Sequence, residues 1–153
     1  MKNFPTSTMV LVVDDEEADR SEMREVLKAA GYPIVEAANC EEAIAISSRN
    51  KSIGFLVADI SLPDGDGCDL ALRLHADNSE LRVLFVSGHV GAEVCRFYGL
   101  DIRDVHFLRK PFSGEMLLSR VREIGQSVEP FPARITAHSG RGSGGETATM
   151  PRG

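Results

Sequence analysis

The feature that most constrains the fold is a run of four apolar residues that ends in a carboxylate, from Phe55 to Asp59. A short apolar run bounded by turn residues is typical of a strand buried on both faces. The segment after it, 60–67, contains a proline and two glycines, which end the strand. Asp59 is therefore expected at the carboxyl end of a buried strand, the edge at which open α/β sheets bind ligands. A capping or turn role is the alternative, but Asp is rarely buried without a partner, which favours a functional role.

Apolar strands and amphipathic helices alternate along the rest of the chain. After the first predicted strand, Met23, Val26 and Leu27 fall on one face of a helix. Gly31 is a suitable residue to end that helix. The predicted strands are 9–13, 34–37, 55–59, 82–86 and 105–108.

Capping residues mark the starts of two later helices. Asn39 is followed three residues on by Glu42, a variant of the capping box, and Ser113 can cap the last helix. Val94 and Phe97 indicate a further short helix between the last two strands. Five alternations of strand and helix with short connections predict an α/β fold, a doubly wound parallel sheet with helices on both faces.

The composition fits one globular domain with short extensions. We expect a flexible leader at 1–8, the folded domain at 9–125 and a flexible tail rich in glycine and proline at 126–153. The net charge of −6 disfavours nucleic-acid binding, and no apolar run is long enough to cross a membrane. The three cysteines have no C-x-x-C spacing, so a cytoplasmic protein is expected.

Polar residues follow four of the five predicted strands. They are Asp14 and Asp15 after the first, Asp59 on the third, Ser87 on the fourth and Lys110 after the fifth. A parallel sheet brings these residues to one edge, where the carboxylates repel one another unless a cation is bound. Their oxygen ligands suit Mg²⁺. A carboxylate nucleophile, a metal ion, a lysine and a hydroxyl are the parts needed for phosphoryl transfer.

The acidic triplet from Asp14 to Glu16 has a second interpretation. Acidic residues are common at the N-terminus of a helix, where they offset the helix dipole. Taken alone, the triplet fits a helix start as well as a metal site. Asp59 and Lys110 favour the metal site.

These motifs together resemble the receiver domain of bacterial response regulators in two-component signalling. The resemblance covers about 9–125 and includes the Asp14–Asp15 pair, Asp59 followed by Pro63, and Ser87 and Lys110 after their strands. It implies a flavodoxin-like (βα)5 fold with strand order 2-1-3-4-5. It also implies a phosphoacceptor switch rather than an enzyme acting on external substrates.

The resemblance also assigns roles to the residues at the sheet edge. Asp59 would be phosphorylated by a histidine kinase or a phosphotransfer protein. Asp14, Asp15 and Asp59 would hold Mg²⁺ together with the backbone carbonyl of Ser61. Lys110 would contact the phosphoryl group.

The resemblance implies further roles for four residues. Ser87 would contact the phosphoryl group and switch together with Phe107, although ordinary core packing fits Phe107 equally well. Ser61 and His89 occupy positions that tune hydrolysis in this family, although His89 can also be merely exposed. The Lys110–Pro111 peptide bond is expected to be cis, as is typical of the family.

Other function classes fit the sequence less well. A degenerate receiver that only binds partners would not need all five polar residues. A Mg²⁺-dependent phosphohydrolase commonly has an acid two residues after the nucleophile, where this chain has Ser61. Asp14 and Asp15 would repel the phosphate of a flavin.

The resemblance also implies an output surface, the face formed by the fourth helix, the fifth strand and the fifth helix. There we expect an unknown downstream protein or a second copy of the chain to bind on phosphorylation. The domain could stand alone or belong to a hybrid kinase or a longer regulator.

Overall fold

A computed structural model of the chain describes residues 8–88, 99, 105–127 and 131. Its main sheet has five parallel strands in the order β2-β1-β3-β6-β7. The predicted order 2-1-3-4-5 is therefore confirmed, because β6 and β7 are the fourth and fifth strands of this sheet. The strands are β1 (Met9–Val13), β2 (Ile34–Ala37), β3 (Ile53–Asp59), β6 (Arg82–Ser87) and β7 (His106–Arg109).

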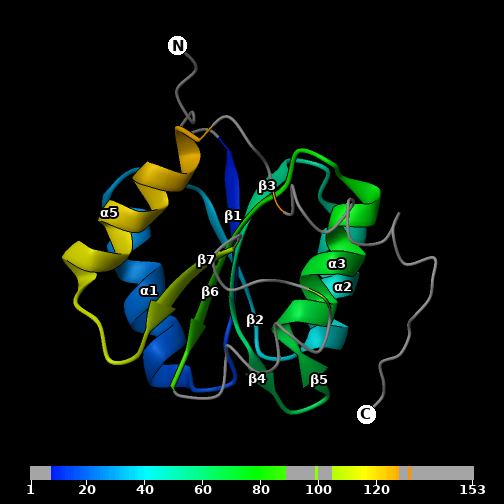
Figure 1. Ribbon diagram of the computed structural model, residues 1–153, viewed down its shortest axis with the longest axis horizontal. Helices are drawn as coiled ribbons and strands as arrows, with labels where there is room; N and C mark the ends of the chain where they lie inside the picture. Colours follow the sequence, from blue (N-terminus) through cyan, green and yellow to red (C-terminus); the bar gives the residue numbers. More distant parts are fainter. Residues whose placement is uncertain (1–7, 89–98, 100–104, 128–130, 132–153) are drawn as a thin grey trace.

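Helices cover both faces of the sheet, with α1 and α5 on one side and α2 and α3 on the other (Figure 1). The helix predicted around Val94 and Phe97 lies outside the described residues. In the described part of the chain, no helix has the length and apolar character needed to cross a membrane. The helices are α1 (Glu17–Ala29), α2 (Cys40–Arg49), α3 (Gly67–Asp77) and α5 (Gly114–Gly125).

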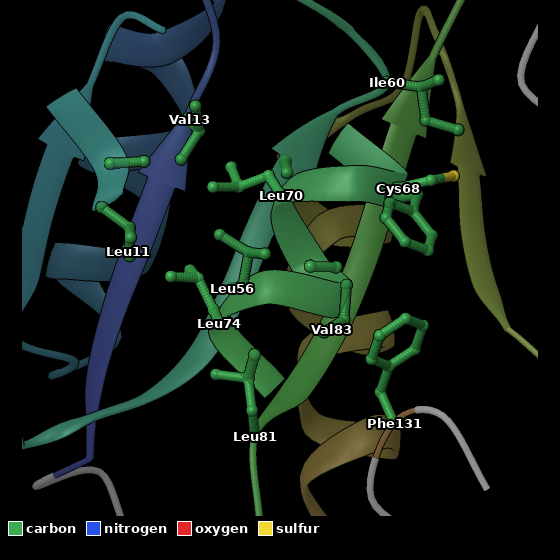
Figure 2. Packing of buried hydrophobic residues seen from close by; sticks show 14 of the residues in the cluster. Leu11, Val13, Leu56, Ile60, Cys68, Leu70, Leu74, Leu81, Val83 and Phe131 are labelled. Atoms are coloured by element: carbon green, nitrogen blue, oxygen red, sulfur yellow. The ribbon is translucent and has the colours of Figure 1, made fainter. Parts of the chain in front are cut away.

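Strand β3 is buried on both faces, as its apolar run predicts. Phe55 and Val57 belong to the hydrophobic cluster that also contains residues of α1 and α5. Leu56 and Ala58 belong to a second cluster on the other face of the sheet, which includes residues of α3 (Figure 2). The sheet therefore holds Asp59 at the end of a strand that is packed on both sides.

The predicted helix caps are present. The Asn39 side chain accepts a hydrogen bond from the Glu42 N–H at 2.8 Å. The Glu42 carboxylate accepts one from the Ala38 N–H at 2.8 Å, which completes the box one residue earlier than the standard pattern. The Ser113 hydroxyl accepts a hydrogen bond from the Met116 N–H at 3.1 Å. Local sequence therefore fixes where α2 and α5 begin.

The loop predicted after Asp59 contains a short antiparallel hairpin. Its strands are β4 (Ser61–Leu62) and β5 (Gly65–Asp66). Strands of two residues give no alternating pattern, which is why the sequence indicates only a loop there. The hairpin is attached to α2, because the Asp64 carboxylate accepts hydrogen bonds from the N–H groups of Cys40 and Glu41 at 2.8 and 3.0 Å.

One residue of the predicted tail, Phe131, is packed against the domain. Its N–H donates to the Leu81 carbonyl at 3.1 Å, and its side chain points into the cluster beside α3 (Figure 2). Its ring meets those of Phe85 and His75 edge to face, with centroids 5.7 and 6.0 Å apart. Phe131 itself therefore belongs to the packed part of the domain, and a flexible tail beyond it stays a prediction.

Candidate functional site

Three carboxylates meet at the carboxyl edge of the sheet. Asp14 and Asp15 follow β1, and Asp59 ends β3, the strand that pairs with β1. Each offers a carboxylate oxygen that lies within 4.8 Å of the others. Asp14 is fully buried, Asp59 is 7% exposed and Asp15 is exposed. These three residues form the acidic cluster that the sequence predicts.

The ammonium group of Lys110 lies in the acidic cluster. It donates hydrogen bonds to Oδ2 of Asp59 at 2.8 Å, of Asp14 at 2.9 Å and of Asp19 at 3.0 Å. The backbone N–H of Lys110 donates to the carbonyl of Ser87 at 2.8 Å, which fixes the start of this loop to β6. The contact with Asp19, in the first turn of α1, was not predicted from the sequence.

Burial and charge shift the pKa values of two of these groups in the same direction. Burial raises the pKa of Asp14, against the opposing effects of the Glu16 N–H and Lys110. Burial alone would lower the pKa of Lys110, but its hydrogen bonds to Asp59, Asp14 and Asp19 outweigh that effect and raise the pKa. Lys110 is therefore charged at neutral pH.

An arginine not predicted from the sequence supports the loop after β1. Arg20 donates from Nη1 to the backbone carbonyl of Asp14 at 2.8 Å. Its Nε donates to Glu36 on β2 at 3.0 Å, and Glu36 also pairs with Arg24 at 2.9 Å. The Asp14 carboxylate also accepts a hydrogen bond from the Glu16 N–H at 2.9 Å. The backbone of Asp14 is therefore attached to both α1 and β2.

The backbone after Asp59 folds back tightly. The Ser61 N–H donates to Oδ1 of Asp59 at 2.9 Å, and the Gly67 N–H donates to the Ile60 carbonyl at 2.9 Å. A Cβ atom at Gly67 would lie 2.5 Å from the carbonyl oxygen of Asp59, so only glycine fits there. Ser61 itself is exposed, beside the carboxylate it contacts.

The remaining predicted site residues lie on β6 and β7 or outside the described residues. Ser87 is the last residue of β6 and is 1% exposed, and β6 pairs with β3 beside Asp59. Phe107 is half-buried on β7, opposite Phe85. The Lys110–Pro111 peptide bond is cis, as expected. His89 lies outside the described residues.

The donor set fits a hard divalent cation. All the candidate side-chain ligands are carboxylate oxygens, from Asp14, Asp15 and Asp59. Asp19 adds a carboxylate to this region, so Lys110 contacts three carboxylates, those of Asp14, Asp19 and Asp59, and the exposed Asp15 lies beside two of them. These carboxylates carry more negative charge than Lys110 balances, and their oxygen atoms are the ligands that Mg²⁺ prefers. Mg²⁺ binds few protein carboxylates and retains several waters.

This fold and this acidic pocket define a receiver-type signalling domain. The family model of the response regulator receiver domain matches residues 10–122, so the chain belongs to this family. Receiver domains are signalling modules of two-component systems and not conventional enzymes.

Curated relatives are about a third identical to the chain over the region that they share with it. The sensor kinase CckA of Brucella abortus (strain 2308) is 33% identical over 119 residues, which are 77% of this chain and 12% of the kinase. The response regulator MprA of Mycobacterium leprae (strain TN) is 31% identical over 124 residues, which are 81% of this chain and 54% of that protein. The chain therefore spans only part of the length of these relatives.

Solved structures show the same fold. The receiver domain of the hybrid histidine kinase CckA has a TM-score of 0.65 and 33% identity, covering 77% of this chain and 99% of that one. A CheY-like receiver domain protein of Methanospirillum hungatei JF-1 has a TM-score of 0.66 and 22% identity, covering 89% and 99%.

Proposed function

We propose that the chain is a phosphoacceptor switch in which Asp59 receives a phosphoryl group in the presence of Mg²⁺. The donor is a phosphohistidine of a histidine kinase or a phosphotransfer protein. The observation that supports this most directly is the position of Lys110 Nζ, 2.8 Å from Asp59 within the acidic cluster. The carboxylate is thus next to a fixed positive charge that can receive phosphoryl oxygens.

The transfer needs few protein groups. A carboxylate oxygen of Asp59 attacks phosphorus as the phosphorus–nitrogen bond breaks, and the electron pair of that bond stays on the imidazole nitrogen. In this proposal Lys110 balances charge on the phosphoryl oxygens, and the Ser87 hydroxyl donates a hydrogen bond to one of them. Asp14, Asp15, Asp59 and the Ser61 carbonyl would hold Mg²⁺, which neutralises charge on the transferring group.

The output of the switch is a change in the face that includes β7 and α5. On phosphorylation, Ser87 and Phe107 change position together and alter this face for binding to a downstream protein or to a second copy of the chain. Met116 supports this assignment, because it lies on α5 and its 50% exposure is high for a large apolar residue. Ser61 and His89 tune the hydrolysis of the acyl phosphate.

The remaining parts of the proposal concern the setting of the domain. The folded unit spans 9–125 together with the packed Phe131, with a leader at 1–8 and a tail in the rest of 126–153. We place it in the cytoplasm, where histidine kinases present their phosphohistidine, either as a separate protein or as part of a hybrid kinase or longer regulator.

Intact-mass measurement after incubation with acetyl phosphate and Mg²⁺ tests this function. We expect one added phosphoryl group in the wild-type protein and in Asp64→Asn, a control that changes a carboxylate of the same loop. We expect none in Asp59→Asn or without Mg²⁺. An unmodified wild-type protein would refute the proposal, and modification of Asp59→Asn would show that another residue is the nucleophile.

A further inference from the structure

We propose that Asp19 is a positioning residue that competes with the incoming phosphoryl group for Lys110 and so slows the phosphorylation of Asp59. This inference rests on the proposed phosphoacceptor function. It begins from the hydrogen bonds of Lys110. An ammonium group has three N–H donors, and Asp59, Asp14 and Asp19 each accept one at 2.8, 2.9 and 3.0 Å. A phosphoryl oxygen can therefore hydrogen-bond to Lys110 only by displacing one of these carboxylates.

The three carboxylates differ in how easily they can leave. The Asp14 side chain is completely buried, so losing Lys110 would leave its charge away from water and balanced by the Glu16 N–H instead of an ammonium group. The Asp59 side chain is 10% exposed and is the reacting group itself. The Asp19 side chain is 44% exposed, so water can solvate it as soon as it leaves Lys110. Asp19 is therefore the partner that an incoming phosphoryl oxygen displaces at least cost.

The surroundings of Asp19 leave room for this exchange. A cavity of about 290 Å³ lies between α1 and the loop after β7. Asp19 and Lys110 both line it, so the Asp19 carboxylate can turn away from Lys110 into open space. Glu22 lines the same cavity but is not among the hydrogen-bond partners of Lys110. The chain thus offers a second acidic residue that lines the same cavity and carries the same charge but lacks the contact with Lys110.

The experiment compares phosphorylation rates in variants of the 153-residue chain. The rate constant for modification by acetyl phosphate at saturating Mg²⁺ is measured by intact mass for wild type, Asp19→Asn and Asp19→Ala. Glu22→Gln controls for the charge beside the cavity. Glu17→Gln controls for a negative charge in the first turn of α1, where Glu17 and Asp19 both interact with the helix dipole. The dissociation constant for Mg²⁺ is measured by calorimetry without a phosphodonor.

We expect both Asp19 variants to be phosphorylated about two- to fivefold faster than either control, the range that corresponds to losing an exposed ion pair. The affinity for Mg²⁺ should stay within twofold of the wild type, because Asp19 is not among the predicted ligands. Equal rates in the Asp19 variants and the controls would overturn the inference. Slower phosphorylation, or a parallel change in Mg²⁺ affinity, would also overturn it. An unmodified wild-type protein would refute the proposed function and this inference together, whereas a modified wild type with unchanged Asp19 variants would refute the inference alone.

Discussion

Replacing Phe131 by alanine should show how strongly the segment after α5 is bound to the domain. Phe131 is 6% exposed and makes edge-to-face contacts with Phe85 and His75. Truncating a core phenylalanine typically costs about 3–5 kcal/mol, and an aromatic pair adds about 0.5–1.5 kcal/mol beyond its burial.

The position of Phe131 after the last helix limits this loss. An alanine variant can release the segment instead of keeping a cavity, so the loss cannot exceed the free energy of docking. Burying the side chain contributes about 1.5–3 kcal/mol, and the hydrogen bond to Leu81 adds about 1 kcal/mol. Ordering the backbone of Phe131 opposes these gains by about 1–2 kcal/mol. We therefore expect the free energy of unfolding to fall by about 2 kcal/mol, less than for a phenylalanine enclosed in the core.

Urea denaturation of four proteins tests this estimate. They are the wild type, Phe131→Ala, a chain that ends at Ser127, and Met116→Ala. Met116 is a large apolar residue that is 50% exposed, so its truncation should cost less than about 0.5 kcal/mol. Phe131→Ala and the shortened chain should lose the same stability. A Phe131→Ala variant as stable as Met116→Ala would refute the reasoning, as would a loss clearly larger than that of the shortened chain.

Three further predictions concern the acidic site and its supports. Burial raises the pKa of Asp14 above its ordinary value of 3.8, so the folded state binds the Asp14 proton more tightly than the unfolded state does. The contribution of Asp14 to the free energy of unfolding therefore falls as pH rises from 3.8 through the raised pKa. Without Mg²⁺, Asp14→Asn should therefore have a higher urea midpoint than the wild type at pH 7. This difference should shrink as pH falls from the raised pKa toward 3.8. Equal urea midpoints of the two proteins at pH 7 would contradict this prediction. Arg20→Gln should weaken Mg²⁺ binding by roughly tenfold in calorimetry, because it frees the loop that carries the proposed ligand Asp14. Arg24→Gln lacks the contact to that loop and should leave Mg²⁺ binding unchanged. Gly67→Ala should lower the free energy of unfolding by about 1–3 kcal/mol, because the alanine Cβ would lie 2.5 Å from a backbone oxygen of β3. Gly88→Ala is the control, because its Cβ would have nothing within 4 Å. Equal urea midpoints in the two variants would show that the loop relaxes freely.

The sheet could be predicted from the sequence because its strands are short apolar runs. The alternating assignment of Phe55 and Leu56 to opposite faces follows directly from burial on both sides. The start of β3 was placed two residues late, because Gly54 separates the buried Ile53 from the apolar run. Phe131 gave no signal, since a single aromatic residue in a segment rich in glycine and proline has no periodicity.

The core of the site could be predicted because parallel strands bring their carboxyl ends to one edge. That rule located Asp14, Asp59 and Lys110 together. It could not locate Asp19 or Arg20, because both lie on α1 and point to partners from other elements. Asp19 is 91 residues from Lys110 in the sequence, and only the packing of α1 against the sheet brings them together.

Two acidic residues outside the cluster fix the loop after Asp59. Asp64 accepts hydrogen bonds from the first N–H groups of α2, and Asp66 accepts one from the Asp69 N–H at the start of α3. Each such cap is worth about 0.5–2 kcal/mol, and helix dipoles balance both charges. Moving this loop would break both caps, whereas the contact of Lys110 with the exposed Asp19 can be exchanged for a phosphoryl oxygen, as proposed above. Phosphorylation of Asp59 is therefore expected to move Lys110 and the neighbouring ends of β6 and β7, whereas the loop beside α2 and α3 should stay in place.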